Sequence, residues 1–379
     1  MSPRPYRIEV PEAVLNDLHR RLDSTRWSEP LPGAPWEHGA SVEYIRELCS
    51  HWRHRYDWRH HEAALNQFPQ FLCEVDGVDL HFWHVKGKGP RSTPLLLVHG
   101  WPGSIHEFHH LIGPLTDPAA HGGDAADSFD VVIPALPGYG FGGKPRDKGW
   151  DVIRVARAYD TLMREHLGYS RYGAQGGDWG AFVGMMLGAH HGASVLGLHL
   201  NLAIAPPPPG EEHTEEAKRV SAETAQWQKN EAGYSHVHST KPQSLGIAQS
   251  DSPAGIAAWI VEKFRTWSDC GGDVESLFSK DWLLTNIMFY WAPNSITSAA
   301  HLYRETAEHS AQERVFAPVR VPTAVAVFPK EIMKAPRRWI EHRFDLRRYT
   351  EMPRGGHFAA VEQPKLWLDD VRAFFRELR

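Results

Sequence analysis

The chain has 379 residues, of which 42% are hydrophobic and 23% charged, a composition typical of a globular protein with a large core. Its formal charge of −5 implies no nucleic-acid partner, and no apolar run reaches the length of a membrane span. Residues 1–10 do not form a signal peptide, and Cys49, Cys73 and Cys270 lie too far apart in the sequence to suggest a disulfide framework. We therefore expect a cytoplasmic protein.

Residues 1–75 carry no catalytic pattern and are expected to wrap around a main domain. The spacing of apolar residues predicts amphipathic helices at Pro11–Leu22 and from Ser41 onward, but these residues are too few for a core of their own. His51 and His54 lie one helical turn apart and could bind a metal. Such a run is more often a solvated helix face, and no third ligand stands nearby. We therefore expect no metal site.

Patterns of strands alternating with helices define residues 76–205 as the first part of the main domain. The predicted strands are Val78–Val85, Leu95–Val98, Phe129–Pro134, Arg171–Gln175 and Val195–Leu202. A helix is predicted around residues 153–167. Continuous apolar runs such as Leu95–Val98 are typical of strands that are buried on both faces of a parallel sheet. The alternation predicts an α/β protein, with a mostly parallel sheet and helices on both of its faces.

The most informative stretch is Gly176–Gly180, with the sequence Gly-Gly-Asp-Trp-Gly, between a predicted strand and a buried helix. Glycines two residues before and after Asp178 suit a sharp strand-to-helix turn that presents one side chain above the sheet. Esterases and lipases carry serine at this position. A carboxylate there can attack an electrophilic carbon and form a covalent ester. On these residues alone, an aspartate that merely caps the following helix is equally consistent.

A second glycine-rich stretch, Gly138–Lys144, has the spacing of a phosphate-binding loop. Such a loop needs serine or threonine as its next residue to bind magnesium, and here Pro145 follows. We therefore interpret the stretch as a loop beside the active site rather than as a nucleotide site.

A run of four prolines, Pro206–Pro209, ends the alternating pattern. Residues 206–312 are then predicted to be helical and aromatic, and to form a cap, or lid, over the active site. Residues 313–379 complete the main domain. They contain two more predicted strands and a last amphipathic helix, at Pro322–Phe328, Leu346–Met352 and Trp367–Leu378.

Asp178, Glu331 and His357 occur in the order nucleophile, acid and histidine, and each follows a predicted strand. That order is the signature of the α/β-hydrolase fold. The sequence around these residues resembles the microsomal-type epoxide hydrolases, and the resemblance extends over nearly the whole chain. The motifs that carry it are His99–Ser104, Gly176–Gly180, Phe328–Glu331 and Gly355–Ala359. The membrane-anchoring helix of the mammalian members is absent, so we expect no membrane partner.

The resemblance implies a cofactor-independent enzyme that acts on a small-molecule epoxide and water. Asp178 would attack an epoxide carbon and form an ester. Tyr234 and Tyr303, both in the cap, would protonate the ring oxygen, although a tyrosine in a cap is more often a packing residue. His357 would then take a proton from the water that hydrolyses the ester. Glu331 would fix the tautomer of the imidazole and stabilise its charged form.

The oxyanion of the second step needs hydrogen-bond donors near the nucleophile. We expect the backbone N–H groups of Trp101 and Trp179 to form this oxyanion hole. The side chains of Trp101, Trp179, Phe141 and Phe358 are predicted to line an apolar substrate pocket.

Two other functions share parts of this pattern. A haloalkane-type or fluoroacetate dehalogenase also uses aspartate in this turn, but it releases a halide and needs no phenolic acid. A non-catalytic binding protein on the same fold would need none of the three triad residues. The tyrosine pair, the N-terminal segment and the intact triad favour an epoxide hydrolase.

Aromatic residues of the predicted cap favour an apolar or aryl epoxide as the substrate. They are Trp227, Trp259, Trp267, Phe289, Tyr290 and Trp291. The sequence leaves open a role in natural-product assembly or in detoxification, the regiochemistry and enantiopreference, and the oligomeric state, for which a homodimer is one option.

Overall fold

A computed structural model of the chain describes residues 2–33, 35–309 and 312–379. Within them, nine strands form one sheet in the order β1-β2-β3-β5-β4-β6-β7-β8-β9. The neighbours from β5 to β9 are parallel, whereas β1, β2 and β3 add an antiparallel edge. The strands are β1 Arg4–Tyr6, β2 Gln70–Val75, β3 Val78–Val85, β4 Thr93–Val98, β5 Phe129–Pro134, β6 Tyr172–Gly176, β7 Val195–Leu200, β8 Val319–Val327 and β9 Phe344–Glu351. The predicted mostly parallel sheet is confirmed.

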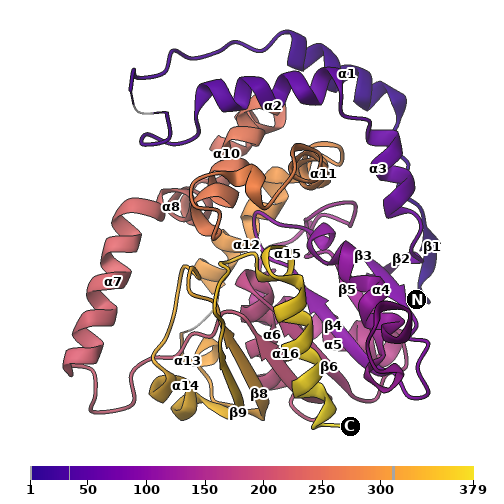
Figure 1. The fold of residues 1–379 in the computed structure, drawn as a ribbon, viewed down its shortest axis with the longest axis vertical. Helices are drawn as coiled ribbons and strands as arrows, with labels where there is room; N and C mark the ends of the chain where they lie inside the picture. The colour runs from indigo at the N-terminus through magenta and orange to yellow at the C-terminus, as the bar shows by residue number, and fades with distance from the viewer. Residues whose placement is uncertain (1, 34, 310–311) are drawn as a thin grey trace.

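Helices cover both faces of this sheet (Figure 1). Those of the main domain are α4 Ile112–Thr116, α5 Val152–Thr161, α6 Asp178–His190, α13 Gln312–Val315, α14 Arg337–Arg343, α15 Ala359–Glu362 and α16 Pro364–Arg376. Successive residues of a strand point to opposite faces, and β7 shows the consequence. Leu198 packs against Gly188 of α6, whereas His199 Nε2 lies 3.0 Å from Asp370 Oδ2 of α16. The two helices therefore sandwich the sheet.

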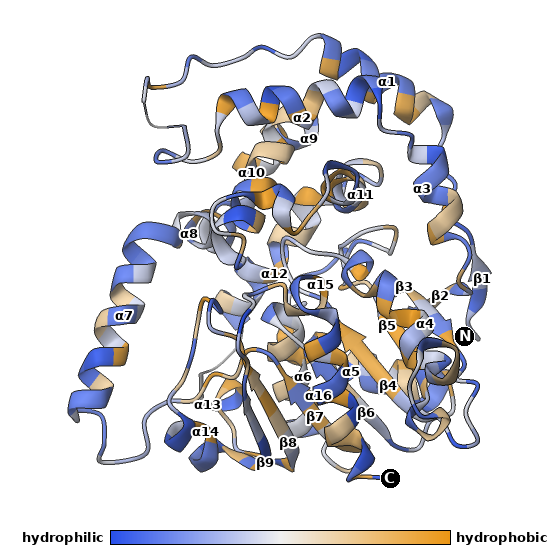
Figure 2. Ribbon diagram, in the orientation of Figure 1, coloured by the Kyte–Doolittle hydropathy of each residue, from blue (hydrophilic) through white to orange (hydrophobic). Residues whose placement is uncertain are grey.

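The central strands are buried along almost their whole length, as continuous apolar runs predict. Every residue of β5 and β6 is buried, and so are the last four residues of β4. Figure 2 shows these strands as a hydrophobic centre within more polar surroundings. This rigid core is what fixes the positions of the loops at the carboxyl ends of the strands.

Between β7 and residue 309 the described residues form helices and no strand. These helices are α7 Glu215–Glu231, α8 Gly233–Thr240, α9 Pro242–Asp251, α10 Pro253–Trp267, α11 Lys280–Trp291 and α12 Ile296–His309. Most of them lie together above the sheet, and α7 extends along one side (Figure 1). None of the helices in the described part of the chain combines the length and the apolar character that a membrane crossing requires.

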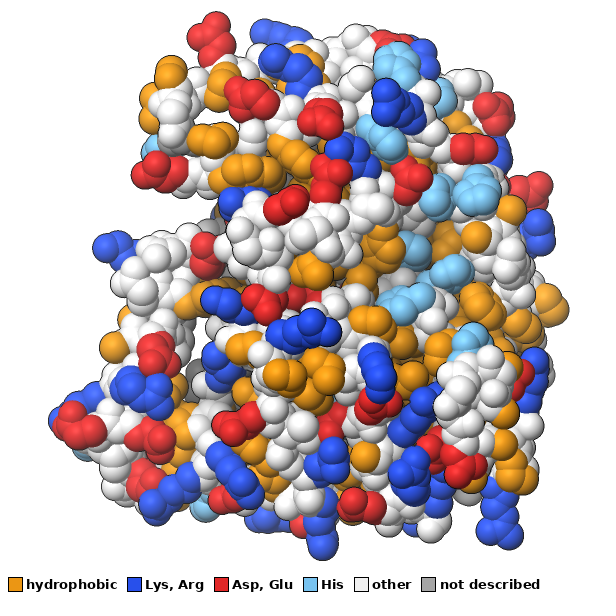
Figure 3. Space-filling model, in the orientation of Figure 1, with side chains coloured by type: hydrophobic (Ala, Val, Ile, Leu, Met, Phe, Trp, Pro, Cys, Tyr) orange, Lys and Arg blue, Asp and Glu red, His pale blue; other side chains and the backbone are white. Residues whose placement is uncertain are grey.

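The N-terminal segment crosses over these helices and then descends to the edge of the sheet (Figure 1). Its helices are α1 Glu12–Asp23, α2 Val42–His54 and α3 Trp58–Leu65. The Tyr56 hydroxyl lies 3.0 Å from Thr285 Oγ1 of α11, and His51 Nε2 lies 2.6 Å from Asp281 Oδ1 of the same helix. Histidines gather on this face of the molecule (Figure 3). The segment also supplies β1 and β2, two strands that the sequence analysis did not anticipate.

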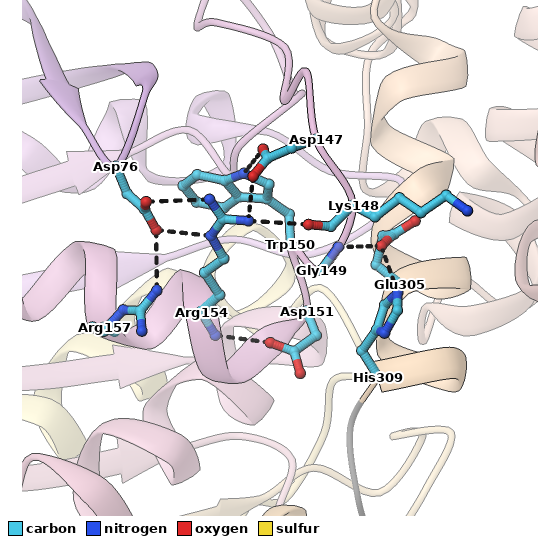
Figure 4. Close-up of polar contacts among 10 residues, drawn as sticks. All are labelled: Asp76, Asp147, Lys148, Gly149, Trp150, Asp151, Arg154, Arg157, Glu305 and His309. Carbon is cyan, nitrogen blue, oxygen red and sulfur yellow. Dashed lines mark hydrogen bonds and ion pairs between the residues drawn. The ribbon is translucent and has the colours of Figure 1, made fainter.

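A polar cluster ties α12 to the main domain (Figure 4). Arg154 of α5 forms an ion pair with Asp76, which lies in the turn between β2 and β3. In the loop before α5, the Gly149 N–H donates a hydrogen bond to Glu305 Oε2 of α12. Glu305 follows Tyr303 by two residues, so the cluster anchors the helix that carries this tyrosine.

Candidate active site

Asp178 is the first residue of α6 and follows β6 after a single glycine. Its backbone has φ +48°, in the left-handed region, where a residue other than glycine costs about 1–3 kcal/mol. Three glycines permit this turn. A Cβ atom at Gly180 would lie 1.9 Å from Val98 O, one at Gly176 would lie 2.3 Å from the backbone of Gly180, and one at Gly100 would lie 2.3 Å from Asp178 Oδ1.

One backbone N–H group contacts the Asp178 carboxylate, and a second lies next to Asp178 in the chain. The Trp101 N–H donates a hydrogen bond to Asp178 Oδ1 at 2.8 Å. The Trp179 N–H belongs to the first turn of α6, where backbone N–H groups have no acceptor within the helix. His99 supports the loop that carries Trp101, because its Nε2 accepts the Leu136 N–H at 3.1 Å. Burial lowers the pKa of His99 to about 4, so this imidazole is neutral and can accept.

His357 lies between two carboxylates. Its Nδ1 is 2.7 Å from Glu331 Oε1, and its Nε2 is 3.3 Å from Asp178 Oδ2. The side chains of His357 and Glu331 are 2% and 1% exposed, whereas that of Asp178 is 16% exposed and is the one that a substrate can reach. Burial acts to lower the pKa of His357, but the charges and hydrogen bonds of Glu331 and Asp178 outweigh it and raise that pKa well above its ordinary value.

The loop that carries His357 is held by the end of α10. The His357 N–H donates to Trp267 O at 3.0 Å, and the Gly355 N–H donates to Asp269 Oδ2 at 2.9 Å. The Asp269 N–H in turn donates to Glu362 Oε2 of α15 at 2.8 Å. The helices over the sheet therefore help to fix His357 as well as to cover it.

Tyr234 of α8 and Tyr303 of α12 lie together beside Trp101 and Trp179, and both tyrosines are buried. The Tyr234 ring stacks on Trp101 at 4.9 Å, and the Tyr303 ring meets Trp179 edge-on at 4.6 Å, measured between centroids. The two tyrosine rings are 5.9 Å apart. Burial, with the negative charge of Asp178 as a further cause, raises the pKa of each tyrosine. Both hydroxyls therefore keep their protons at neutral pH.

The two phenylalanines that were predicted to line the pocket occupy different places. Phe358 follows His357 and stacks on Phe264 of α10 at a centroid distance of 4.1 Å. Phe141 lies farther away, between Trp58 of α3 and Phe289 of α11. The structure thus brings Phe358 to the site, whereas Phe141 lies where the N-terminal segment meets α11.

Sequence reasoning missed three polar residues beside the triad. Glu107, Gln175 and Asn201 line a small cavity that also touches Asp178 and His357. The signals were present but ambiguous. Gln175 lies in the strand before the sharp turn, and Glu107 stands three residues after Ser104, a spacing that also occurs where helices begin.

The strand-to-helix turn, the backbone donors and the order of the triad define an α/β-hydrolase. Residues 93–244 match the family described as alpha/beta hydrolase fold, and residues 3–108 match the one described as Epoxide hydrolase N terminus. The chain belongs to the epoxide hydrolase family, which confirms the resemblance seen in the sequence motifs.

Individual relatives agree over nearly the whole length. A protein of Stigmatella aurantiaca (strain DW4/3-1), provisionally named an epoxide hydrolase, is 44% identical over 99% of this chain and 85% of its own. Epoxide hydrolase 1 of Oryctolagus cuniculus is 38% identical over 98% of this chain and 88% of its own. The crystal structure of juvenile hormone epoxide hydrolase from the silkworm Bombyx mori has a TM-score of 0.91 at 31% identity and covers 100% of this chain and 95% of that one.

Proposed function

We propose that the protein hydrolyses an apolar epoxide to a vicinal diol through an ester on Asp178. The observation that carries this proposal is that the two carboxylate oxygens of Asp178 have different neighbours. Oδ1 accepts the Trp101 N–H at 2.8 Å, and Oδ2 lies 3.3 Å from His357 Nε2. These contacts support the assignment of Oδ1 to the oxyanion hole and of Oδ2 to the attack on carbon.

In the first step, Asp178 Oδ2 attacks an epoxide carbon, and the bond between that carbon and the ring oxygen breaks. The ring oxygen would leave as an alkoxide unless an acid supplies a proton. Tyr234 and Tyr303 fit this role because they are protonated, buried and in contact with the tryptophans that flank Asp178. Each of them stabilises charge that develops only as the ring opens.

In the second step, water attacks Asp178 Cγ, and the oxyanion forms on Oδ1 beside the Trp101 N–H. His357 must be neutral to take the proton of this water. At rest it is held protonated by Glu331 and Asp178. Formation of the ester removes the charge of Asp178, which lowers the pKa of His357 and converts it into a base at the moment when a base is needed.

The tyrosine pair favours epoxide opening over dehalogenation, because a departing halide needs no proton. A binding protein without catalysis would have no use for a buried histidine placed between two carboxylates. An apolar substrate is favoured by the rings around the nucleophile.

The test is isotope labelling over many turnovers in ¹⁸O-water, followed by digestion and mass spectrometry of the peptide that contains Asp178. Attack of water on Cγ places heavy oxygen in the Asp178 carboxylate. The matched control is His357→Gln protein, which should incorporate little label because its ester is not hydrolysed. Label that appears only in the diol would mean direct attack of water on the epoxide and would reject the ester.

A further inference from the structure

A small cavity beside the triad has the size and the polar lining of a site for one water molecule. Its volume is about 20 Å³, and a buried water needs roughly 10–15 Å³ and two to four polar partners. Its polar lining residues are His99, Glu107, Gln175, Asp178, Asn201 and His357. The nucleophile and its base therefore border the same water-sized space.

One atom of this lining is a hydrogen-bonding group that lacks a partner. Gln175 Oε1 is buried without a hydrogen bond to any described residue, whereas His357 Nε2 faces Asp178 Oδ2 at 3.3 Å. The orientation of the Gln175 amide is fixed, because its Nε2 donates to Asn201 Oδ1 at 3.0 Å. Its carbonyl oxygen is therefore an acceptor with no donor. An unsatisfied buried polar atom destabilises the fold, and a bound water that donates to it would offset this cost.

Glu107 contributes a third polar group. It is 9% exposed, and its carboxyl group occupies the space beside Gly103, where a Cβ atom would lie only 1.5 Å from Glu107 Oε1. Burial raises the pKa of Glu107 to about 8, and the charge of His357 and, less strongly, a hydrogen bond with the Ser104 backbone oppose the rise. A capping role toward Ser104 accounts for one hydrogen bond of this carboxyl, but not for its position on the lining of the cavity.

We propose that Glu107 and Gln175 bind the hydrolytic water against His357 and Asp178, and that Glu107 acts only in the second half of the reaction. The inference rests on the proposed ester. The water oxygen bonds to Asp178 Cγ, and one of its protons passes to His357 Nε2. The bond between Cγ and the alkyl oxygen then breaks, the diol oxygen takes the second proton, and Asp178 is regenerated as a carboxylate.

Two variants disturb Glu107 in different ways. Glu107→Gln keeps the shape of the side chain but removes its acidic proton. Gly103→Ala leaves every ionisable group in place and displaces the carboxyl, because the added methyl group needs the space of Glu107 Oε1. Glu62→Gln is the matched control, since Glu62 is also a buried glutamate but lies in the N-terminal segment.

Single-turnover stopped flow with styrene oxide separates the two steps by tryptophan fluorescence, and intact-mass spectrometry measures the ester. We expect Glu107→Gln and Gly103→Ala to form the ester within about twofold of the wild-type rate and to hydrolyse it roughly 10- to 100-fold more slowly. Both rates should stay at wild-type values in Glu62→Gln. Ester formation in the same variants shows that they are folded.

Wild-type hydrolysis rates in both variants, or an equal slowing of both steps, would overturn the water-binding role. A different result would overturn the ester itself. If neither the wild-type protein nor His357→Gln forms an ester with an epoxide that the wild-type protein turns over, the proposed function fails and this inference fails with it. The two failures are therefore distinguishable.

Discussion

The buried carboxyl group of Glu107 should make the protein less stable as the pH rises toward 8. Its pKa is raised by burial from 4.5 to about 8. Between these values the folded chain holds a proton that the unfolded chain releases. The free energy of unfolding therefore falls by about 1.4 kcal/mol per pH unit from this group, or about 5 kcal/mol over the whole window. Its contribution is complete below pH 4.5 and is lost as the pH passes 8.

Glu107→Gln isolates this contribution, because glutamine has the same shape and does not titrate. Ionisable groups that do not interact with Glu107 change protonation alike in both proteins, so their effects cancel in the difference. The variant should match the wild type to within about 1 kcal/mol near pH 5 and should be more stable by about 3 kcal/mol at pH 7. Urea unfolding, followed by tryptophan fluorescence from pH 5 to 9, measures this difference.

A difference that does not change with pH would refute the reasoning, because it would mean that Glu107 titrates normally in the fold. A variant that loses stability relative to the wild type as the pH rises would mean that the ionised carboxylate is stabilised. The expected gain of stability in Glu107→Gln also bears on function. A substitution that stabilises the protein at pH 7 while slowing ester hydrolysis would show that the fold keeps a costly carboxyl group for its chemistry.

Three further predictions concern the catalytic groups themselves. His357→Gln should form the ester and fail to hydrolyse it, so intact-mass spectrometry should find the protein heavier by the mass of one epoxide. Tyr234→Phe and Tyr303→Phe should each slow ester formation, and the double variant should slow it at least about 100-fold with little change in substrate binding. Asp178→Asn imitates the uncharged ester, so the pKa of His357, followed by NMR, should be lower than in the wild type, and an unchanged pKa would contradict the proposed switch.

The sequence predicts the core well because its signals are local. The predicted strand Phe129–Pro134 coincides with β5, and the apolar run Leu95–Val98 forms most of β4. Continuous apolar runs of this length have few alternatives to burial in a parallel sheet. The helix after Asp178 was visible for the same reason, since it is apolar around its whole circumference and buried along most of its length.

The antiparallel edge was invisible because its signals are not local. Arg4–Tyr6 has no apolar alternation, and its pairing with Gln70–Val75 joins segments more than sixty residues apart. Strand propensity depends strongly on such partners. Helices α8 and α9 lie in the stretch that was predicted to be helical, but their bounds have no local signal, since neither shows a clear apolar stripe and both are positioned by packing against α12.

The same distinction separates the parts of the site that the sequence reveals from those that it hides. Asp178, Glu331 and His357 each follow a strand, and the carboxyl ends of parallel strands meet at one edge of a sheet, so their convergence can be predicted. Glu107 follows Ser104 at a helix-capping spacing, and only its three-dimensional neighbours turn it into a buried acid. The position of Phe141 depends on the path of a glycine-rich loop, which the sequence pattern does not determine.

The charges around His357 close the proton balance of the proposed cycle. At rest, Asp178 and Glu331 are negative, His357 is positive and Glu107 is neutral, which gives the buried site one net negative charge. In the proposed cycle, ester formation neutralises Asp178 and creates an alkoxide, and the proton that His357 then loses balances the one that the alkoxide gains. Hydrolysis returns a proton from water to His357 and a charge to Asp178. The resting site, the ester and the hydrolysed site therefore carry the same net charge. No proton has to enter from solvent during the cycle. This agrees with the burial of His357, whose side chain is 2% exposed.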